Sequence, residues 1–167
     1  MVLLFCVVFT GLFAQEDMSG KMISIDTGAG ISMAFIETDN ALLGFLTFLF
    51  GMRGIYFADA RFLISDMMSA GAELGIAAMS VSFDDGATST LFLDLPIRGI
   101  FRFGKGGTFI QAYAGLYMPV SPTFDTLFDV GIKGSLGGLY TEVSYLMGTT
   151  SYARAAIGFA LNDIVSF

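Results

Sequence analysis

Inside each apolar segment of this sequence, the charged side chains, with the exception of Asp163, fall on one of the two alternating sets of positions, and their types allow two kinds of chemistry. Carboxylates can act as general acids and bases, or they can form charge-assisted hydrogen bonds with Arg and Lys. In each segment, one set of alternating positions holds large apolar residues and the other set, of opposite parity, holds small or polar residues. Ten charged residues lie on the small or polar parity: Asp26, Arg53, Glu73, Asp94, Arg98, Arg102, Asp129, Lys133, Glu142 and Arg154. Five are acids and five are bases. The set can therefore neutralise itself, as a closed interior requires.

Catalysis by these residues is the less favoured interpretation. Asp94 and Glu142 could act as an acid–base pair, but the sequence contains no His, on which known barrel acyltransferases and proteases depend. Ion pairing explains both carboxylates more simply. The segment 104–107, Gly-Lys-Gly-Gly, lacks the frame of a phosphate-binding loop and indicates a tight turn. We therefore expect no enzyme activity, no catalytic residues, no metal site and no cofactor.

The composition indicates a surface that does not face water. Hydrophobic residues make up 54% of the 167 residues, charged residues only 14%, and the mean hydropathy is +0.73. Soluble domains carry about 25% charged residues. The formal net charge of −7 argues against nucleic acid as a partner, because phosphate binding requires Lys and Arg.

The first fourteen residues, MVLLFCVVFTGLFA, predict a cleavable signal peptide that ends at Ala14. The segment is too short for a membrane-spanning helix, which needs about 20 residues. It lacks a basic start, and Leu12 is large for its place before the cleavage site, so a short buried or anchoring helix is the alternative. The lone Cys6 lies in this segment, which leaves a mature chain without thiols. We expect residues 15–21 to form a short periplasmic segment and residues 22–167 to form one domain.

Strands explain the rest of the chain better than helices. The longest uncharged apolar run in the mature chain, 41–52, is ended by Arg53 and is too short to span a bilayer as a helix. A period of two, typical of strands, is present in eight segments: 22–36, 46–59, 69–83, 91–103, 110–118, 128–135, 139–147 and 154–167. Turn residues separate them, the link between Asp59 and Ser69 being the least defined. Pro96 interrupts the fourth segment, where we expect a bulge.

The charges indicate which face is outside. Arg or Lys on a lipid-facing strand costs about 2–4 kcal/mol near the bilayer midplane, whereas the same groups can pair inside a lumen. A soluble barrel of the lipocalin type would reverse this arrangement, with polar residues outside. The sequence therefore predicts an all-β fold, a transmembrane up-and-down antiparallel β-barrel of eight strands. Aromatic residues near the expected strand ends suggest interface girdles: Phe35, Tyr56, Phe101, Phe103, Phe109, Tyr152 and Phe167.

Two segments resemble those of small outer-membrane barrels. The chain ends with Phe159, Leu161, Val165 and Phe167 on one parity, which resembles the C-terminal signal that the barrel-insertion machinery reads. Asp163 departs from that pattern and is expected at the periplasmic rim. The segment 93–117 is similar to the central hairpin of the family that includes OmpX, the OmpA membrane domain and opacity proteins. The resemblance covers residues 22–167 and implies the outer membrane of a diderm bacterium, with the lipid bilayer and the insertion machinery as partners.

Two functions remain open at this stage. An eight-stranded barrel is just wide enough to be filled by side chains, which favours a structural or surface-interaction role. The alternative is a narrow porin-like channel for small or hydrophobic solutes, with space left beside glycines such as Gly28, Gly30 and Gly131. Five acids are expected on the outer rim, where they could attract cations or host surface ligands: Glu37, Asp39, Asp84, Asp85 and Asp125.

Overall fold

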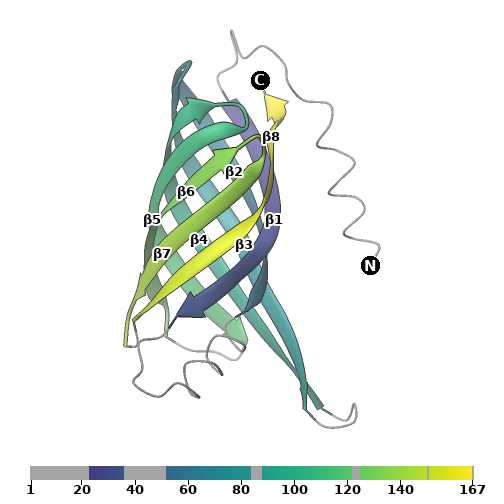
Figure 1. The fold of residues 1–167 in the computed structure, drawn as a ribbon. Helices are drawn as coiled ribbons and strands as arrows, with labels where there is room; N and C mark the ends of the chain where they lie inside the picture. The colour runs from purple at the N-terminus through teal and green to yellow at the C-terminus, as the bar shows by residue number, and fades with distance from the viewer. Residues whose placement is uncertain (1–22, 36–51, 84–87, 122–124, 150, 167) are drawn as a thin grey trace.

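The described residues of the computed structural model, 23–35, 52–83, 88–121, 125–149 and 151–166, form eight antiparallel strands in one closed barrel (Figure 1). Each strand pairs with its neighbours in the chain, and the last strand pairs with the first. The expected fold class is confirmed. The strands are β1 (Ile23–Phe35), β2 (Arg53–Ser65), β3 (Met68–Phe83), β4 (Thr88–Lys105), β5 (Thr108–Ser121), β6 (Leu127–Leu136), β7 (Leu139–Met147) and β8 (Tyr152–Ser166).

Alternation of side chains along each strand separates the two faces of the wall. In β7, Tyr140, Glu142, Ser144 and Leu146 are buried in the lumen, and the residues between them are exposed on the outside. Successive side chains of a strand point to opposite faces, so a period of two in the sequence becomes one face of the sheet. Among the described residues, no helix is long and apolar enough to cross a membrane.

The two ends of the barrel differ in their connections. Three short turns, at 66–67, 106–107 and 137–138, lie at one end, which we call the turn end (Figure 1). Gly106, Gly137 and Gly138 have φ values of 55°, 61° and 89°, which L-residues with a Cβ rarely adopt. The opposite end, the loop end, carries the longer connections. There β3 and β4 continue as a two-stranded hairpin beyond the pairs Gly54–Ala78 and Leu93–Ser121 that join them to β2 and β5.

The second strand differs from its predicted position. We expected it at 46–59, but β2 begins at Arg53 and continues to Ser65, and residues 46–51 lie outside the described part of the chain. Leu63 and Ile64 belong to β2, and the turn is confined to Asp66 and Met67. The second strand was expected to end at Asp59, which left Arg61 in the poorly defined link before Ser69. Both residues are buried members of the inward parity, so the alternation continues through them.

The expected bulge at Pro96 is wrong in detail. Pro96 pairs in register with Tyr117, and the shift between β4 and β5 lies between Leu93 and Asp94. On the other side, the ladder with β3 is interrupted between the pairs Leu74–Ile97 and Ala77–Asp94. Proline has no N–H to donate to a ladder, so the local cost of Pro96 is an interrupted ladder on the β3 side.

Candidate functional site in the barrel lumen

The ten charged residues predicted for the lumen all lie on the inner face of the wall. Most are buried, and Arg53 and Asp94 are the most accessible, with 16% and 10% of their side chains exposed. Every carboxylate of this set contacts at least one Arg or Lys side chain, as the following groups show. A buried charge is tolerated only when a partner of opposite charge compensates it. Ionised side chains can therefore fill this barrel only because they are paired.

The middle of the lumen holds a group of ion pairs that connects five strands. Arg98 on β4 contacts Glu73 on β3 at 2.7 Å, Asp129 on β6 at 2.7 Å and Glu142 on β7 at 3.2 Å. Arg154 on β8 contacts the same Glu142 at 2.7 Å and Asp129 at 3.4 Å. Arg98 therefore bridges carboxylates from three other strands, and Arg154 bridges carboxylates from two.

Lys133 completes this middle group from β6. Its ammonium group pairs with Glu73 and lies 3.7 Å from Glu142. The Tyr113 hydroxyl donates a hydrogen bond of 2.9 Å to Glu142. Three cations and three carboxylates thus balance one another within the described lumen, so the group carries no excess charge that a ligand would have to neutralise.

A second group lies nearer the turn end. Arg61 contacts Asp26 at 2.7 Å and Asp59 at 3.0 Å, and Arg102 pairs with the same two carboxylates. Gln111 links this group to the middle one. Its amide oxygen accepts from Arg102 at 2.7 Å, and its amide nitrogen donates to Glu73 at 3.3 Å. The two groups therefore form one continuous polar network along the barrel axis.

The loop end holds a separate pair. Arg53 Nε lies 3.4 Å from Asp94 Oδ2, and the Tyr117 hydroxyl donates to Asp94 at 2.8 Å. Beside it, Tyr117, Leu127 and Leu146 form a buried apolar cluster against which Tyr152 packs. The lumen therefore changes from mainly ionic at the turn end and the middle to partly apolar near the loop end.

Aromatic rings lie against five of the lumen cations. The guanidinium carbons of Arg102 and Arg98 lie 3.6 Å and 4.2 Å from the ring centroids of Phe109 and Tyr113. Similar contacts pair Lys133 with Phe57 and Tyr140, Arg154 with Tyr117 and Arg53 with Phe92. A cation over a ring face gains roughly 0.5–2 kcal/mol, more when it is desolvated. These rings fill the space between ion pairs without adding charge.

Several inward glycines make room for these aromatic side chains. A Cβ added to Gly28 would overlap the Phe57 ring, one on Gly30 would lie 2.6 Å from the Tyr140 hydroxyl, and one on Gly131 would lie 2.6 Å from Tyr113 Cζ. The space that glycine leaves in the wall is therefore occupied by a ring. This packing is what a filled lumen requires.

Four lumen residues were missed or misplaced by the sequence reading. Asp59, at the predicted end of the second strand, and Arg61, in the link that follows it, are absent from the predicted network. Phe57 was assigned no role, and Phe109 was expected in an interface girdle, but both are buried in the lumen. The signal for Phe109 was present, because it shares the parity of Gln111, Tyr113 and the other inward residues of β5.

The remaining predicted site residues are placed as follows. Of the five rim acids, Glu37, Asp39, Asp84 and Asp85 lie outside the described residues, and Asp125 is exposed and accepts a 2.8 Å hydrogen bond from Thr149. At the C-terminus, Phe159 and Val165 are exposed and Leu161 is half-buried, while Phe167 lies outside the described residues. Asp163, expected at the periplasmic rim, lies at the turn end, where its carboxylate is 3.5 Å from Arg61.

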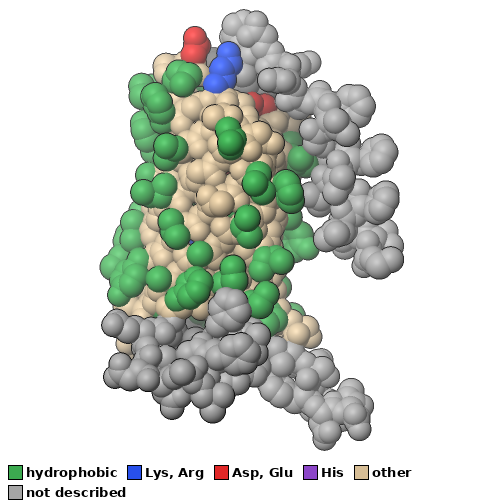
Figure 2. All heavy atoms as spheres, in the orientation of Figure 1, with side chains coloured by type: hydrophobic (Ala, Val, Ile, Leu, Met, Phe, Trp, Pro, Cys, Tyr) green, Lys and Arg blue, Asp and Glu red, His purple; other side chains and the backbone are tan. Residues whose placement is uncertain are grey.

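The outer wall is apolar. Figure 2 shows one face on which hydrophobic side chains are spread over the length of the barrel, with charged side chains visible near the turn end. In the described strands, Lys105 at the end of β4 is the only exposed charged side chain. Large hydrophobic side chains are exposed all around the wall, among them Ile110, Val143 and Phe159 at 63% each.

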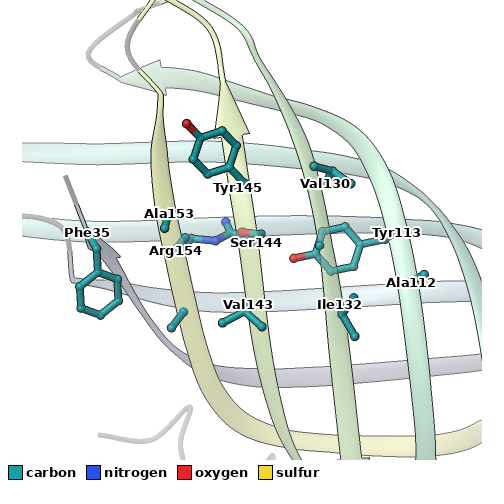
Figure 3. Close-up of a pocket in the computed structure, with 12 residues that line it drawn as sticks. Phe35, Ala112, Tyr113, Val130, Ile132, Val143, Ser144, Tyr145, Ala153 and Arg154 are labelled. Atoms are coloured by element: carbon teal, nitrogen blue, oxygen red, sulfur yellow. The ribbon is translucent and has the colours of Figure 1, made fainter. Parts of the chain in front are cut away.

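A shallow pocket of about 610 Å³ lies on the outer wall over β5–β8 (Figure 3). Val130, Ile132, Val143 and Tyr145 form much of its exposed lining, with Phe35 at one side. Its lining is almost wholly apolar, so the pocket offers little to a polar ligand. Among the residues that the structure describes, no cluster of three or more Asp, Glu, Cys or His side chains could hold a metal ion.

The chain matches no protein-family model and no curated protein sequence. Among solved structures, it is similar to Ail, the attachment invasion locus protein of Yersinia pestis, which was crystallised in complex with the heparin analogue sucrose octasulfate. The alignment covers 84% of this chain and 98% of Ail, with 9% identity and a TM-score of 0.41. These values are too low to transfer a function from one protein to the other.

Proposed function

We propose that this chain is an integral outer-membrane β-barrel of a diderm bacterium, whose lumen is closed by side chains and whose role is structural or in surface interaction. The observation that carries the proposal is the reversed polarity of the wall. Soluble monomers rarely expose contiguous apolar patches larger than a few hundred Å², yet hydrophobic side chains are exposed around this barrel and the strand charges are turned inward. A hydrocarbon solvent accounts for both features.

Folding into lipid tests the membrane part of the proposal. The mature chain, residues 15–167, is refolded into vesicles and run on a denaturing gel with and without boiling. We expect the unboiled sample to migrate at a different position, because a closed barrel resists the detergent until it is heated. A chain that folds in buffer without detergent or lipid, and stays monomeric there, would contradict the proposal.

The filled lumen is supported by the continuity of the network. From Asp26 to Arg154, consecutive polar contacts follow the barrel axis, and rings occupy the space beside the inward glycines. A planar bilayer recording should therefore detect no steady unitary conductance from the folded protein. A steady conductance that changes with Arg98→Ala or Asp94→Ala would instead support the channel alternative, since both residues line the lumen.

A surface role would depend on the loop end. The acids expected there, Glu37, Asp39, Asp84, Asp85 and the exposed Asp125, would favour divalent cations or basic host surfaces over anionic ligands. We propose to measure adhesion of host cells to vesicles that carry the folded barrel, at low and physiological salt. Binding that weakens with salt and is lost when all five acids become Asn or Gln would support this role. Binding unaffected by these substitutions would exclude the acids as its cause.

We propose no catalytic role for Asp94 and Glu142. Asp94 is held by Arg53 and Tyr117, and Glu142 by Arg98, Arg154, Lys133 and Tyr113. Both carboxylates therefore serve to balance the charge of the cations in the lumen. The signal peptide at 1–14 and the recognition of the C-terminal strand by the insertion machinery belong to the same proposal, and both can be tested in cells.

A further inference from the structure

The last strand leaves its regular ladder near the C-terminus. β8 pairs with β1 without a shift from Phe35–Ala153 to Thr27–Leu161, and the next pair is Ile25–Val165. Three residues of β8, 162–164, thus lie opposite the single residue Asp26 of β1. At the centre of this bulge, Asp163 has a φ of 55°, the only positive φ of a non-glycine residue in the described chain. Asp can adopt this conformation more readily than most residues, but it remains uncommon.

The bulge turns Asp163 toward the inside and joins it to β1 and β2. Its backbone N–H donates a 2.6 Å hydrogen bond to Asp26 Oδ1. Its carboxylate accepts a 2.5 Å hydrogen bond from the Ser24 hydroxyl and lies 3.5 Å from Arg61 Nη2. An unusual backbone conformation persists only when its surroundings hold it in place, and these three contacts do so.

These contacts join β1 and β8, the pair of strands whose association costs the most conformational entropy. Every other neighbouring pair is joined by a connection between consecutive strands, whereas β1 and β8 lie at opposite ends of the domain sequence. Closing a longer loop costs more conformational entropy, and contacts between distant segments form slowly. Side-chain contacts at this seam therefore add stability where the chain connectivity supplies least.

We propose that Asp163 is a latch that holds the turn end of the β1–β8 seam closed, with Asp26, Ser24 and Arg61 as its receiving residues. The bulge supplies the geometry, because a residue in a regular ladder at this position could not present both its N–H and its carboxylate to the lumen. Without the latch, the end of the seam opens while the rest of the barrel stays paired. This inference concerns closure of the fold and goes beyond the membrane role proposed above.

Amide hydrogen exchange of the full chain folded in detergent micelles tests the latch. Asp163→Ala removes the carboxylate and disfavours the positive φ, so we expect exchange at residues 24–27 and 161–165 to accelerate at least tenfold. Exchange along the β4–β5 ladder, which lies away from the seam, should stay within twofold of the unaltered chain. Asp163→Asn keeps a hydrogen-bond acceptor and tolerates the backbone conformation, so it should restore most of the protection, with less than a threefold change.

Two further variants make the outcome decisive. Asp163→Gly permits the positive φ without a side chain, and seam exchange faster than in Asp163→Asn would assign the remaining effect to the side-chain oxygen that accepts from Ser24. Asp66→Ala removes an exposed acid in the β2–β3 turn at the same end and should leave the seam unchanged. Unchanged seam exchange in Asp163→Ala would overturn the proposal. Equal acceleration in all ladders, or the same seam effect in Asp66→Ala, would overturn it as well.

Discussion

The ammonium nitrogen of Lys133 on β6 lies 3.6 Å from the centroid of the Phe57 ring on β2, so the two side chains meet across the lumen. The same nitrogen pairs with Glu73. One buried cation thus contacts a carboxylate and an aromatic face that come from different strands. Phe57 and Glu73 lie on the neighbouring strands β2 and β3, whereas Lys133 lies on β6, and closure of the barrel brings it to them.

Removing the Lys133 charge should destabilise the barrel strongly. Lys133→Met keeps most of the stem but leaves Glu73 and Glu142 with less compensation, and breaking a buried ion pair from one side costs about 3–5 kcal/mol. We expect a loss of this size in the free energy of unfolding, measured by urea titration of the micelle-folded chain. Lys105→Met, at the exposed end of β4, should change the free energy of unfolding by about 0.5 kcal/mol or less. Similar losses in the two variants would contradict the charge-balance explanation.

A charge on the outer wall distinguishes a lipid-facing barrel from a water-facing one. Val143, at the middle of β7, is 63% exposed, and Leu136, beside the turn end, is 74% exposed. In lipid vesicles, Val143→Lys should cost about 2–4 kcal/mol of folding free energy, whereas Leu136→Lys should cost about 0–1 kcal/mol because it lies near an interface. Two equally neutral substitutions would show that water, rather than hydrocarbon, faces this wall.

Gly75 and Pro96 should be energetically coupled. A Cβ on Gly75 would lie 2.6 Å from Pro96 Cγ, while the next obstacle, the Tyr56 carbonyl oxygen, would be 3.2 Å away. Gly75→Ala should therefore cost about 1–3 kcal/mol by overpacking. Pro96→Ala removes the ring, so the double variant should recover at least about 1 kcal/mol relative to the sum of the single changes. If the losses in stability of the two single variants simply add in the double variant, the overpacking caused by Gly75→Ala does not involve Pro96.

The C-terminal aromatic residue should matter for insertion in cells more than for stability. Deleting Phe167 removes the residue that the resemblance assigns to recognition by the insertion machinery. We expect the amount of folded barrel in the outer membrane to fall several-fold, while refolding of the purified chain into micelles stays unchanged. Phe101→Ala, at an exposed wall position in β4, serves as the control for loss of an aromatic side chain. Equal membrane levels for the two variants would argue against a special role for Phe167.

The alternation of the sequence was sufficient for the fold class and for the side of the wall that each charge occupies. Because successive strand residues point to opposite faces, parity alone places Arg98, Asp129 and Glu142 on one face without knowledge of their partners. The same rule holds for Asp59 and Arg61, which the predicted network lacks because the second strand was expected to end at Asp59. The alternation also places Phe109 in the lumen, although an aromatic residue near a strand end suggested a position at the membrane interface.

Partner choice and register depended on the closed structure. Parity does not state how far along the axis a residue lies, and a bulge changes that distance without leaving a clear pattern in the sequence. Arg98 meets Asp129 and Glu142 because three separate ladders set their heights in the lumen. Asp163 reaches Asp26 because β8 bulges there. The sequence by itself therefore determined which side chains of the regular strands turn inward, whereas tertiary pairing decided which of them touch and turned Asp163 inward at the bulge.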